Sequence, residues 1–263
     1  MEKKDKSSSG GNERYILSSV DSALQILNLF LKDAELSGTE IAKKMGISRS
    51  TAFRFLVTLE NRGFLFRSES GKYRLGISIF SLGMMAHSRN ELALILHPYL
   101  EKMVEETGET CHLVVREGAA DVVFLDRVLG TNSLRMDTPL GHKVKLHNTG
   151  TGKAILAFSQ AEAINDYIRH TDFHKETGRS IGSAQELLAV LEKARADGYA
   201  MDNEESEPGL TCIARPLLDS HGTAYAAVSV SGPTTRMIMK KDQILSALKR
   251  IIKQIHYDSV DQV

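Results

Sequence analysis

The sequence predicts an α+β protein with an N-terminal winged helix-turn-helix, a linker helix and a C-terminal domain of mixed strands and helices. Residues 36–63 have the pattern of two short helices joined by a sharp turn, and a short hairpin pattern follows directly. From Glu109 the apolar period changes to that of strands, and helical stretches then alternate with them. This order favours an α+β fold over a doubly wound parallel sheet.

Length and composition fit two folded domains. The chain has 263 residues, of which 42% are hydrophobic and 25% charged, as is ordinary for a globular protein. Residues 1–14 are charged and rich in Ser and Gly, so we expect a flexible tail. We place the winged helix-turn-helix at 15–76, the linker helix at 77–90 and the C-terminal domain at 91–263.

The sequence favours a cytoplasmic location. No apolar run approaches the roughly 18 to 20 residues that span a bilayer, and the first residues lack the apolar segment of a signal peptide. Cys111 and Cys212 are too few and too far apart for a disulfide framework, so we expect both thiols to be reduced.

Residues 36–63 carry the pattern of a helix-turn-helix. In the first helix Ile41, Ala42 and Met45 share one face, and Gly46 follows where a tight turn often needs positive φ. Ser48 is a suitable N-cap for the second helix. In that helix one apolar face comprises Ala52, Phe55, Leu56 and Leu59, and Ser50, Phe53, Arg54 and Val57 point the other way.

The flanking segments favour a winged helix-turn-helix over a helical hairpin whose outer face meets only water. A preceding helix from Ser18 or Ser19 is expected to bury Val20, Leu24, Leu27 and Leu31, with Ala23, Ile26 and Phe30 widening its apolar face. After Gly63, apolar and basic residues alternate around the turn 68–71, as in a short hairpin or wing.

Charge is distributed unevenly along the chain, although the formal net charge is zero. Residues 1–90 hold 14 basic and 9 acidic side chains, and the remaining residues hold 19 basic and 24 acidic side chains. Attraction to phosphate is therefore concentrated at the N-terminal end, which indicates DNA as the partner of the helix-turn-helix.

Several polar residues of the predicted recognition helix can enter a major groove. They are Ser48, Arg49, Ser50, Thr51 and Arg54. Either arginine can read a guanine edge, because a guanidinium matches its two acceptors. The hairpin residues Arg67, Lys72 and Arg74 can contact phosphates, or can simply be solvated.

The C-terminal half alternates between strand and helix patterns after two helical stripes within 76–108. Pro98 is expected in an early helical turn or at a kink. Strands are expected at 110–117, 121–128, 133–136, 143–146, 199–201, 211–216 and 224–230, and helices at 152–157, 161–169, 183–197 and about 240–257. Glu204, Glu205 and Glu207 are expected in a solvated loop.

At this level of detail the chain resembles the isocitrate-lyase-regulator (IclR) family of bacterial transcription factors. The resemblance is carried by SSVDSALQILNLF, the helix-turn-helix, TPLGHKVKLHNTGTGKAILA, GYAMDNEESEPGLTCIARPL and AYAAVSVSGP. It implies an effector domain related to GAF domains, and dimers or dimers of dimers. It also implies an effector pocket whose polar lining is Gly150, Thr151, Asp202, Cys212, Ser229 and Ser231, with Met136, Val144 and Leu210 as its apolar wall.

Part of this pocket can also be explained chemically. Gly150 and Thr151 open a helix, whose free N–H groups can receive a carboxylate. Ser229 and Ser231 share one face of a strand and can bond a carboxylate or keto oxygen. We therefore expect a regulator, acting as a repressor at a pseudo-palindromic operator in double-stranded DNA, that senses a small carboxylate without cofactor or metal.

Other functions have weaker support in the sequence. GTGKA lacks the earlier glycine and the Ser or Thr of a phosphate-binding loop. A hydrolase would need Ser229, Ser231 or Cys212 beside His112, His142 or His147, but no nucleophile-elbow pattern surrounds them. A metal site would use Cys111, His112, His142, His147 and Cys212, whose spacing fits no compact zinc motif. A scaffold without effector is the remaining alternative.

Overall fold

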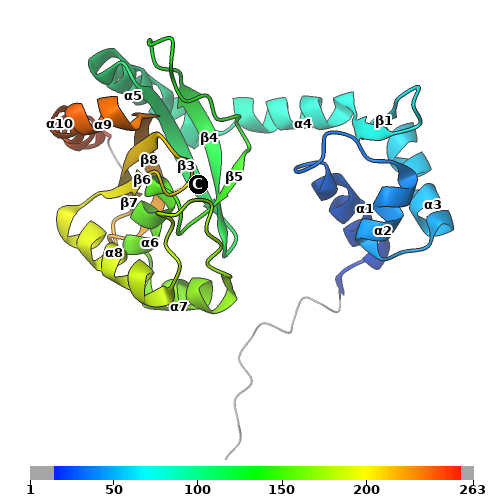
Figure 1. Cartoon of the computed structure of the whole chain (residues 1–263). Helices are drawn as coiled ribbons and strands as arrows, with labels where there is room; N and C mark the ends of the chain where they lie inside the picture. The colour runs from blue at the N-terminus through cyan, green and yellow to red at the C-terminus, as the bar shows by residue number, and fades with distance from the viewer. Residues whose placement is uncertain (1–14, 256–263) are drawn as a thin grey trace, which may run out of the picture. The chain divides into compact units, whose positions relative to one another are not determined.

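The structure is a computed structural model that describes residues 15–255. These residues form two compact units, one ending at Ser88 and the other beginning at Arg89, and Figure 1 labels most of their elements. The flexible tail expected at residues 1–14 lies outside the described residues. No helix in the described part has both the length and the apolar character needed to cross a membrane.

The N-terminal unit has the order of elements predicted for a winged helix-turn-helix and a linker helix. Within the described residues these elements are α1 (Ser18–Leu29), α2 (Gly38–Met45), α3 (Arg49–Asn61), β1 (Leu65–Arg67), β2 (Tyr73–Leu75) and α4 (Ile77–Ser88). The fold class predicted for this part of the chain is confirmed.

Local sequence chemistry sets the ends of α2 and α3. Ser37 and Glu40 form a reciprocal capping box, in which the Ser37 N–H donates to the Glu40 carboxylate (2.7 Å) and the Glu40 N–H donates to Ser37 Oγ (3.3 Å). Gly46 follows α2 with φ 65°, which strains any other residue. Ser48 Oγ accepts a hydrogen bond from the Thr51 N–H (3.1 Å). The predicted turn at Gly46 and N-cap at Ser48 are confirmed.

The buried face of α3 is the predicted one, whereas that of α1 is not. Ala52, Leu56 and Leu59 of α3 are buried. In α1 and at its end only Ile26 and Phe30 are buried, while Val20, Leu24 and Leu31 are 52%, 55% and 59% exposed. The prediction that these three lie in the core was wrong. Helix α1 is apolar on two sides, so its spacing alone allows two buried faces.

The hairpin packs directly on the end of α3. Strands β1 and β2 pair antiparallel with Leu65 opposite Leu75, and Leu36 adds a bridge to Tyr73. Gly76 approaches the Gly63 carbonyl so closely that a Cβ would collide with the backbone. The predicted wing is therefore confirmed, and its exit is fixed by a close approach that only glycine permits.

The C-terminal unit is built on a six-stranded antiparallel sheet in the order β5-β4-β3-β8-β7-β6. Its described strands are β3 (Thr110–Glu117), β4 (Asp121–Val128), β5 (Lys143–Lys145), β6 (Ala200–Asn203), β7 (Leu210–Leu218) and β8 (Ala224–Pro233). Its described helices are α5 (Glu91–Thr107), α6 (Gly150–Ala157), α7 (Ala161–His170), α8 (Ala184–Asp197), α9 (Thr234–Met239) and α10 (Lys241–Ile252).

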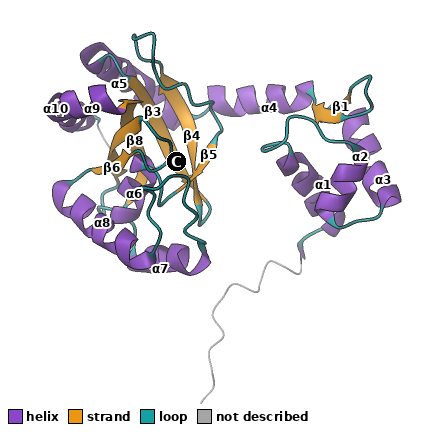
Figure 2. Ribbon diagram, viewed as in Figure 1, coloured by secondary structure: helices purple, strands orange, loops and turns teal. Residues whose placement is uncertain are grey.

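Helices cover both faces of this sheet, as Figure 2 shows. Helices α5 and α10 pack on one face around Leu100 and Leu248, and α6, α7 and α8 pack on the other around Ile155 and Tyr167. Side chains alternate along β7, so that Ile213 joins the first core while Cys212 and Ala214 join the second.

One strand predicted for this unit is absent, and Pro98 does not lie in the early helical turn expected for it. Residues 133–136 form a loop, not a strand, because side chains hold the segment: the Thr110 hydroxyl donates to the Met136 carbonyl (2.8 Å), and Arg127 bonds Asp137 and the Thr138 carbonyl. Pro98 lies in the interior of α5, beyond its first turn, where it removes one helical N–H donor.

The predicted start of the last helix is confirmed, because α10 begins at Lys241. The helix ends at Ile252, before the expected end at Tyr257, which lies outside the described residues. The short helix α9, which precedes it and is separated from it at Lys240 (φ −98°, ψ 8°), was not predicted.

Gly152→Ala is expected to destabilise the C-terminal unit by about 1 to 3 kcal/mol, because a Cβ there would lie 2.5 Å from Leu146 Cα and 2.8 Å from its carbonyl carbon. Urea denaturation followed by circular dichroism measures the change. The control is Gly178→Ala, whose Cβ meets nothing within 4 Å. Equal midpoints for the two variants would contradict the close packing at Gly152.

Candidate functional site

The first candidate site is the exposed face at the N-terminus of α3. Ser48, Arg49, Ser50, Thr51 and Arg54 are all exposed. The Ser48 hydroxyl lies 2.9 Å from that of Ser50 and 2.8 Å from that of Thr51, so the three hydroxyls form one network at the helix start. Neither arginine forms an ion pair with another described residue. Two uncompensated guanidinium groups therefore project from this helix.

The hairpin presents three further basic side chains. The Arg74 guanidinium lies 4.6 Å from the centre of the Phe66 ring, and that of Arg67 lies 5.7 Å from the Tyr73 ring. Phe66 pairs with Arg74 and Arg67 with Tyr73 across the ladder, so the two arginines stand on opposite faces of the hairpin. Lys72 is exposed at the turn. Stacking on a ring limits the motion of each guanidinium.

The second candidate site lies in the C-terminal unit, under α6. Two rows of paired residues cross the sheet there. One row contains Asp202, Cys212, Ser231 and Thr110, and the other contains Ala200, Ala214, Ser229 and His112. Paired residues share a face, so all eight point to the side that α6 covers. Residues more than 100 positions apart in the sequence are brought together in this way.

The start of α6 lies against the first of these rows. A Cβ on Gly150 would be 3.1 Å from Cys212 Sγ and 3.3 Å from the Asp202 nitrogen. Thr149 caps the helix by accepting from the Gly152 N–H (3.1 Å). The N–H groups of Gly150 and Thr151 have no partner among the described residues, as expected in a first helical turn. They can bind an anion or a carbonyl oxygen.

Buried polar groups without partners surround this helix start. Ser229 and Ser231 are each 1% exposed, and neither hydroxyl makes a hydrogen bond of normal geometry with a described residue. Both lie close to the Cys212 thiol. Burial raises the pKa of this thiol to about 11, whereas the neighbouring hydroxyls of Ser231 and Ser229 lower this pKa. Unpaired buried polar groups are costly, so this arrangement suits a ligand that bonds them.

Asp202 is already engaged with its own loop. It accepts hydrogen bonds from the Glu205 N–H (2.7 Å) and from the N–H (3.3 Å) and hydroxyl (2.5 Å) of Ser206. Burial raises its pKa, whereas these bonds lower it. Asp202 therefore holds the turn at residues 203–206, and any further donor would have to share its carboxylate oxygens.

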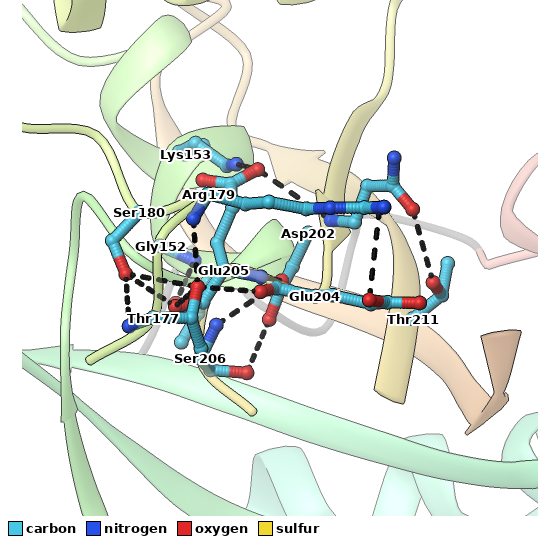
Figure 3. A network of polar contacts seen from close by, with 12 residues as sticks. Gly152, Lys153, Thr177, Arg179, Ser180, Asp202, Glu204, Glu205, Ser206 and Thr211 are labelled. Carbon is cyan, nitrogen blue, oxygen red and sulfur yellow. Dashed lines mark hydrogen bonds and ion pairs between the residues drawn. The ribbon is translucent and has the colours of Figure 1, made fainter. Parts of the chain in front are cut away.

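The same loop contains an ion pair that the sequence did not suggest. Lys153 of α6 is buried and lies 2.5 Å from the Glu205 carboxylate. Thr177 and Ser180 hold the Glu205 carbonyl, as Figure 3 shows. The expectation that Glu205 lies in a solvated loop was wrong, because its side chain is only 13% exposed. Burial raises the Glu205 pKa, and Lys153 lowers it.

Of the remaining expected pocket residues, Leu210 and Val144 lie on the same face of the sheet as the cluster, whereas Met136 lies in a loop. Leu210 precedes Cys212 by two positions on β7, and the Met136 carbonyl accepts from Thr110 beside Ser231. Val144 lies on β5, with β4, β3 and β8 between it and β7. His112, which the sequence placed only in alternative sites, is part of the second row.

The structure brings only part of the alternative sites together: His112 stands opposite Ser229 across β3 and β8. Cys111 joins the opposite core from Cys212, and His147 Nδ1 is hydrogen-bonded to the Tyr167 hydroxyl (2.5 Å). Among the described residues no three His, Cys, Asp or Glu side chains converge on a possible metal position. No hydrogen bond joins Ser229, Ser231 or Cys212 to a histidine in the described part of the chain.

Both cysteines are expected to resist alkylation at pH 7.5. Burial raises the pKa of the Cys212 thiol to about 11 and that of Cys111 well above its usual range. The reactive thiolate therefore forms only as the pH rises towards these values. Mass spectrometry after iodoacetamide treatment should find both thiols unmodified in folded protein and modified in urea. Rapid labelling of the folded protein would contradict this.

These features are those of a DNA-binding transcription factor with a second compact unit. Residues 19–68 match the IclR helix-turn-helix domain, and residues 84–257 match the domain described as the C-terminal part of the bacterial transcriptional regulator IclR. The chain belongs to the IclR family of transcriptional regulators.

Individual relatives agree with this assignment. The chain is 35% identical to the regulator KdgR of Dickeya chrysanthemi, over 84% of this chain and 72% of that protein. It is also 35% identical to the transcriptional repressor IclR of Escherichia coli, over 76% and 73%. The crystal structure of the Thermotoga maritima IclR has 32% identity and a TM-score of 0.65, over 91% and 99%.

Proposed function

We propose that this protein is a ligand-responsive repressor that binds a pseudo-palindromic operator and senses a small carboxylate. The proposal that the protein binds an effector rests on the buried hydroxyls of Ser229 and Ser231 beside the start of α6, which lack hydrogen bonds of normal geometry among the described residues. A repressor role is supported by the name of the E. coli relative. A regulator that binds chromosomal DNA would act in the cytoplasm, and no turnover of its ligand is expected.

In this proposal α3 enters the major groove of the operator. Ser48, Arg49, Ser50, Thr51 and Arg54 face the bases, and either arginine reads a guanine edge. Arg67, Lys72 and Arg74 contact phosphates from the hairpin. Their positions on both faces of the hairpin suit contacts with the two strands that border a groove.

The effector would lie between α6 and the rows on the sheet. The N–H groups of Gly150 and Thr151 receive its carboxylate, and the hydroxyls of Ser229 and Ser231 bond its oxygens. Cys212 and Asp202 border this position, and Met136, Leu210 and Val144 supply apolar surface. The charge of nearby Lys153 is already paired with Glu205. The effector carboxylate would therefore depend on neutral donors, namely these N–H groups and hydroxyls.

Self-association is supported by the exposed apolar side chains of the N-terminal unit. They are Leu17, Val20, Leu24 and Leu31 on and beside α1, and Ile77, Phe80, Leu82, Met84 and Met85 on α4. A second copy of the chain would cover these faces in a dimer, or in a dimer of dimers, and would space two α3 helices along the operator.

Phe80→Asp is expected to dissociate the dimer, because a carboxylate would have to be buried at the interface. Sedimentation velocity measures the change, with Ser81→Asp, on the same helix and exposed, as the control. A monomeric wild type would contradict self-association. An unchanged dimer in the Phe80 variant would place the interface elsewhere.

A thermal-shift screen of small carboxylates, followed by operator binding with each hit, tests the proposed function. A true effector raises the melting temperature and changes operator affinity, because it binds the two functional states unequally. Specific operator binding that no carboxylate alters would contradict effector control. Disappearance of a ligand during incubation would instead identify an enzyme.

A further inference from the structure

His112 is a fully buried histidine of the C-terminal unit whose ring nitrogens have no hydrogen-bond partner among the described residues. Its side chain is 0% exposed, yet neither Nδ1 nor Nε2 has a hydrogen-bond partner among the described residues. An imidazole always carries at least one N–H donor, and leaving a buried donor and acceptor unpaired costs stability. Another buried histidine, His147, uses both nitrogens, with Tyr167 and the His174 carbonyl as partners.

The position of His112 connects it to the proposed effector site. It pairs directly with Ser229 across β3 and β8, and the Ser229 hydroxyl also makes no hydrogen bond of normal geometry within the described part of the chain. The Phe124 ring lies edge-on to the imidazole, with 4.9 Å between centroids, and holds its orientation. Burial and the nearby Arg127 lower the His112 pKa to about 4, so near neutral pH the ring offers one donor and one acceptor.

We propose that His112 determines effector specificity by hydrogen-bonding an oxygen function at the end of the acid remote from its carboxylate. This inference rests on the proposed effector site. A hydroxyl suits this position best, because it both donates and accepts, as His112 and Ser229 do. A carbonyl oxygen is the second choice, because it can only accept.

Sheet geometry sets the size of the acid. His112 lies two strands from Cys212 and one row along, so their Cα atoms are roughly 12 Å apart for ordinary strand spacings. The carboxylate at the start of α6 and the imidazole both project above the sheet into the space between these two Cα atoms, so the gap between them is shorter than this distance. A two-carbon acid held at α6 does not reach the imidazole, whereas a benzene ring or a chain of about four to six carbons does.

The first test needs no ligand. His112→Leu, which is close in volume and removes two unpaired nitrogens, is expected to leave the melting temperature of the free protein unchanged or higher. His147→Leu, the matched control, is expected to lower it, because Tyr167 and the His174 carbonyl lose a partner. An equal fall for both variants would mean that His112 has a structural partner, and would overturn the proposal.

The second test compares paired acids by calorimetric titration of the full-length protein. The pairs are 5-hydroxypentanoate with pentanoate and 3-hydroxybenzoate with benzoate. At least one hydroxy acid is expected to bind the wild type more tightly than its partner. His112→Leu should weaken that hydroxy acid about tenfold and its partner less than twofold, and His112→Gln should recover part of the loss.

The outcomes separate this inference from the proposed function. If hydroxy acids keep their advantage in His112→Leu while operator binding still responds to them, only the role of His112 is wrong. Equal weakening of both members of a pair would also overturn it, because the residue would then act through packing. If none of these acids, nor glyoxylate as a short probe, binds the wild type, both the proposed effector site and the role of His112 fail.

Discussion

Arg54→Ala is expected to weaken operator binding about 10- to 100-fold. Arg54 is exposed on α3, two turns from the Ser48 cap, and forms no ion pair with a described residue. A guanidinium that reads a guanine edge contributes roughly 1 to 3 kcal/mol of discrimination. Fluorescence anisotropy with the operator and with a scrambled duplex measures the loss, which should be larger for the operator.

The matched control is Arg89→Ala, which removes the same charge from an exposed residue outside the helix-turn-helix. Titration at several salt concentrations separates the two possible contacts. Loss of a base contact relaxes specificity, whereas loss of a phosphate contact weakens all duplexes alike and lowers the salt dependence. Unchanged operator affinity at fixed salt would remove Arg54 from the reading face and leave Arg49 as the candidate.

Glu205→Ala is expected to destabilise the C-terminal unit by about 3 to 5 kcal/mol. The variant leaves the Lys153 ammonium, 1% exposed, without its 2.5 Å partner, and an unpaired buried charge is far costlier than a lost surface contact. The backbone that Thr177 and Ser180 hold through the Glu205 carbonyl stays in place, so the loss comes from the charge. Urea denaturation gives the change in midpoint.

A second substitution tests this explanation. Adding Lys153→Met removes the uncompensated charge and should restore most of the lost stability, since apolar replacements of buried ion pairs are often neutral. The control is Lys193→Ala, which breaks an exposed pair with Asp197 and should leave the midpoint unchanged. If the double variant is as unstable as Glu205→Ala alone, packing rather than charge holds this loop.

The helix-turn-helix and the effector site differ in how far the sequence predicts them. The cap at Ser48 and the turn at Gly46 depend on residues within four positions, so their residue types carry the signal. Helix α1 shows the limit, because Leu24 and Ile26 are equally apolar and only the second is buried. The strand expected at 133–136 is a further example, since side-chain bonds from Thr110 and Arg127 hold that segment as a loop.

The effector site required more than local pattern. Resemblance to the family placed Cys212, Ser229 and Ser231 in one pocket, and the strand register brings these residues side by side. Neither source indicated that Glu205 would be buried against Lys153, because a glutamate in a polar loop is ordinarily solvated. His112 was also missed as a pocket residue, because one histidine in an apolar strand has no pattern that distinguishes a ligand from a structural group.

The sequence by itself determined the order of the elements in the N-terminal unit, the local geometry of the helix-turn-helix and the basic character of that unit, since these depend on neighbouring residues. The tertiary structure alone decided which face of α1 is buried, that Lys153 meets Glu205, and that His112 stands opposite Ser229. The Lys153–Glu205 and His112–Ser229 contacts join residues 52 or more positions apart, and the buried face of α1 depends on packing. Strand register and helix docking set them, and neither is encoded in local spacing.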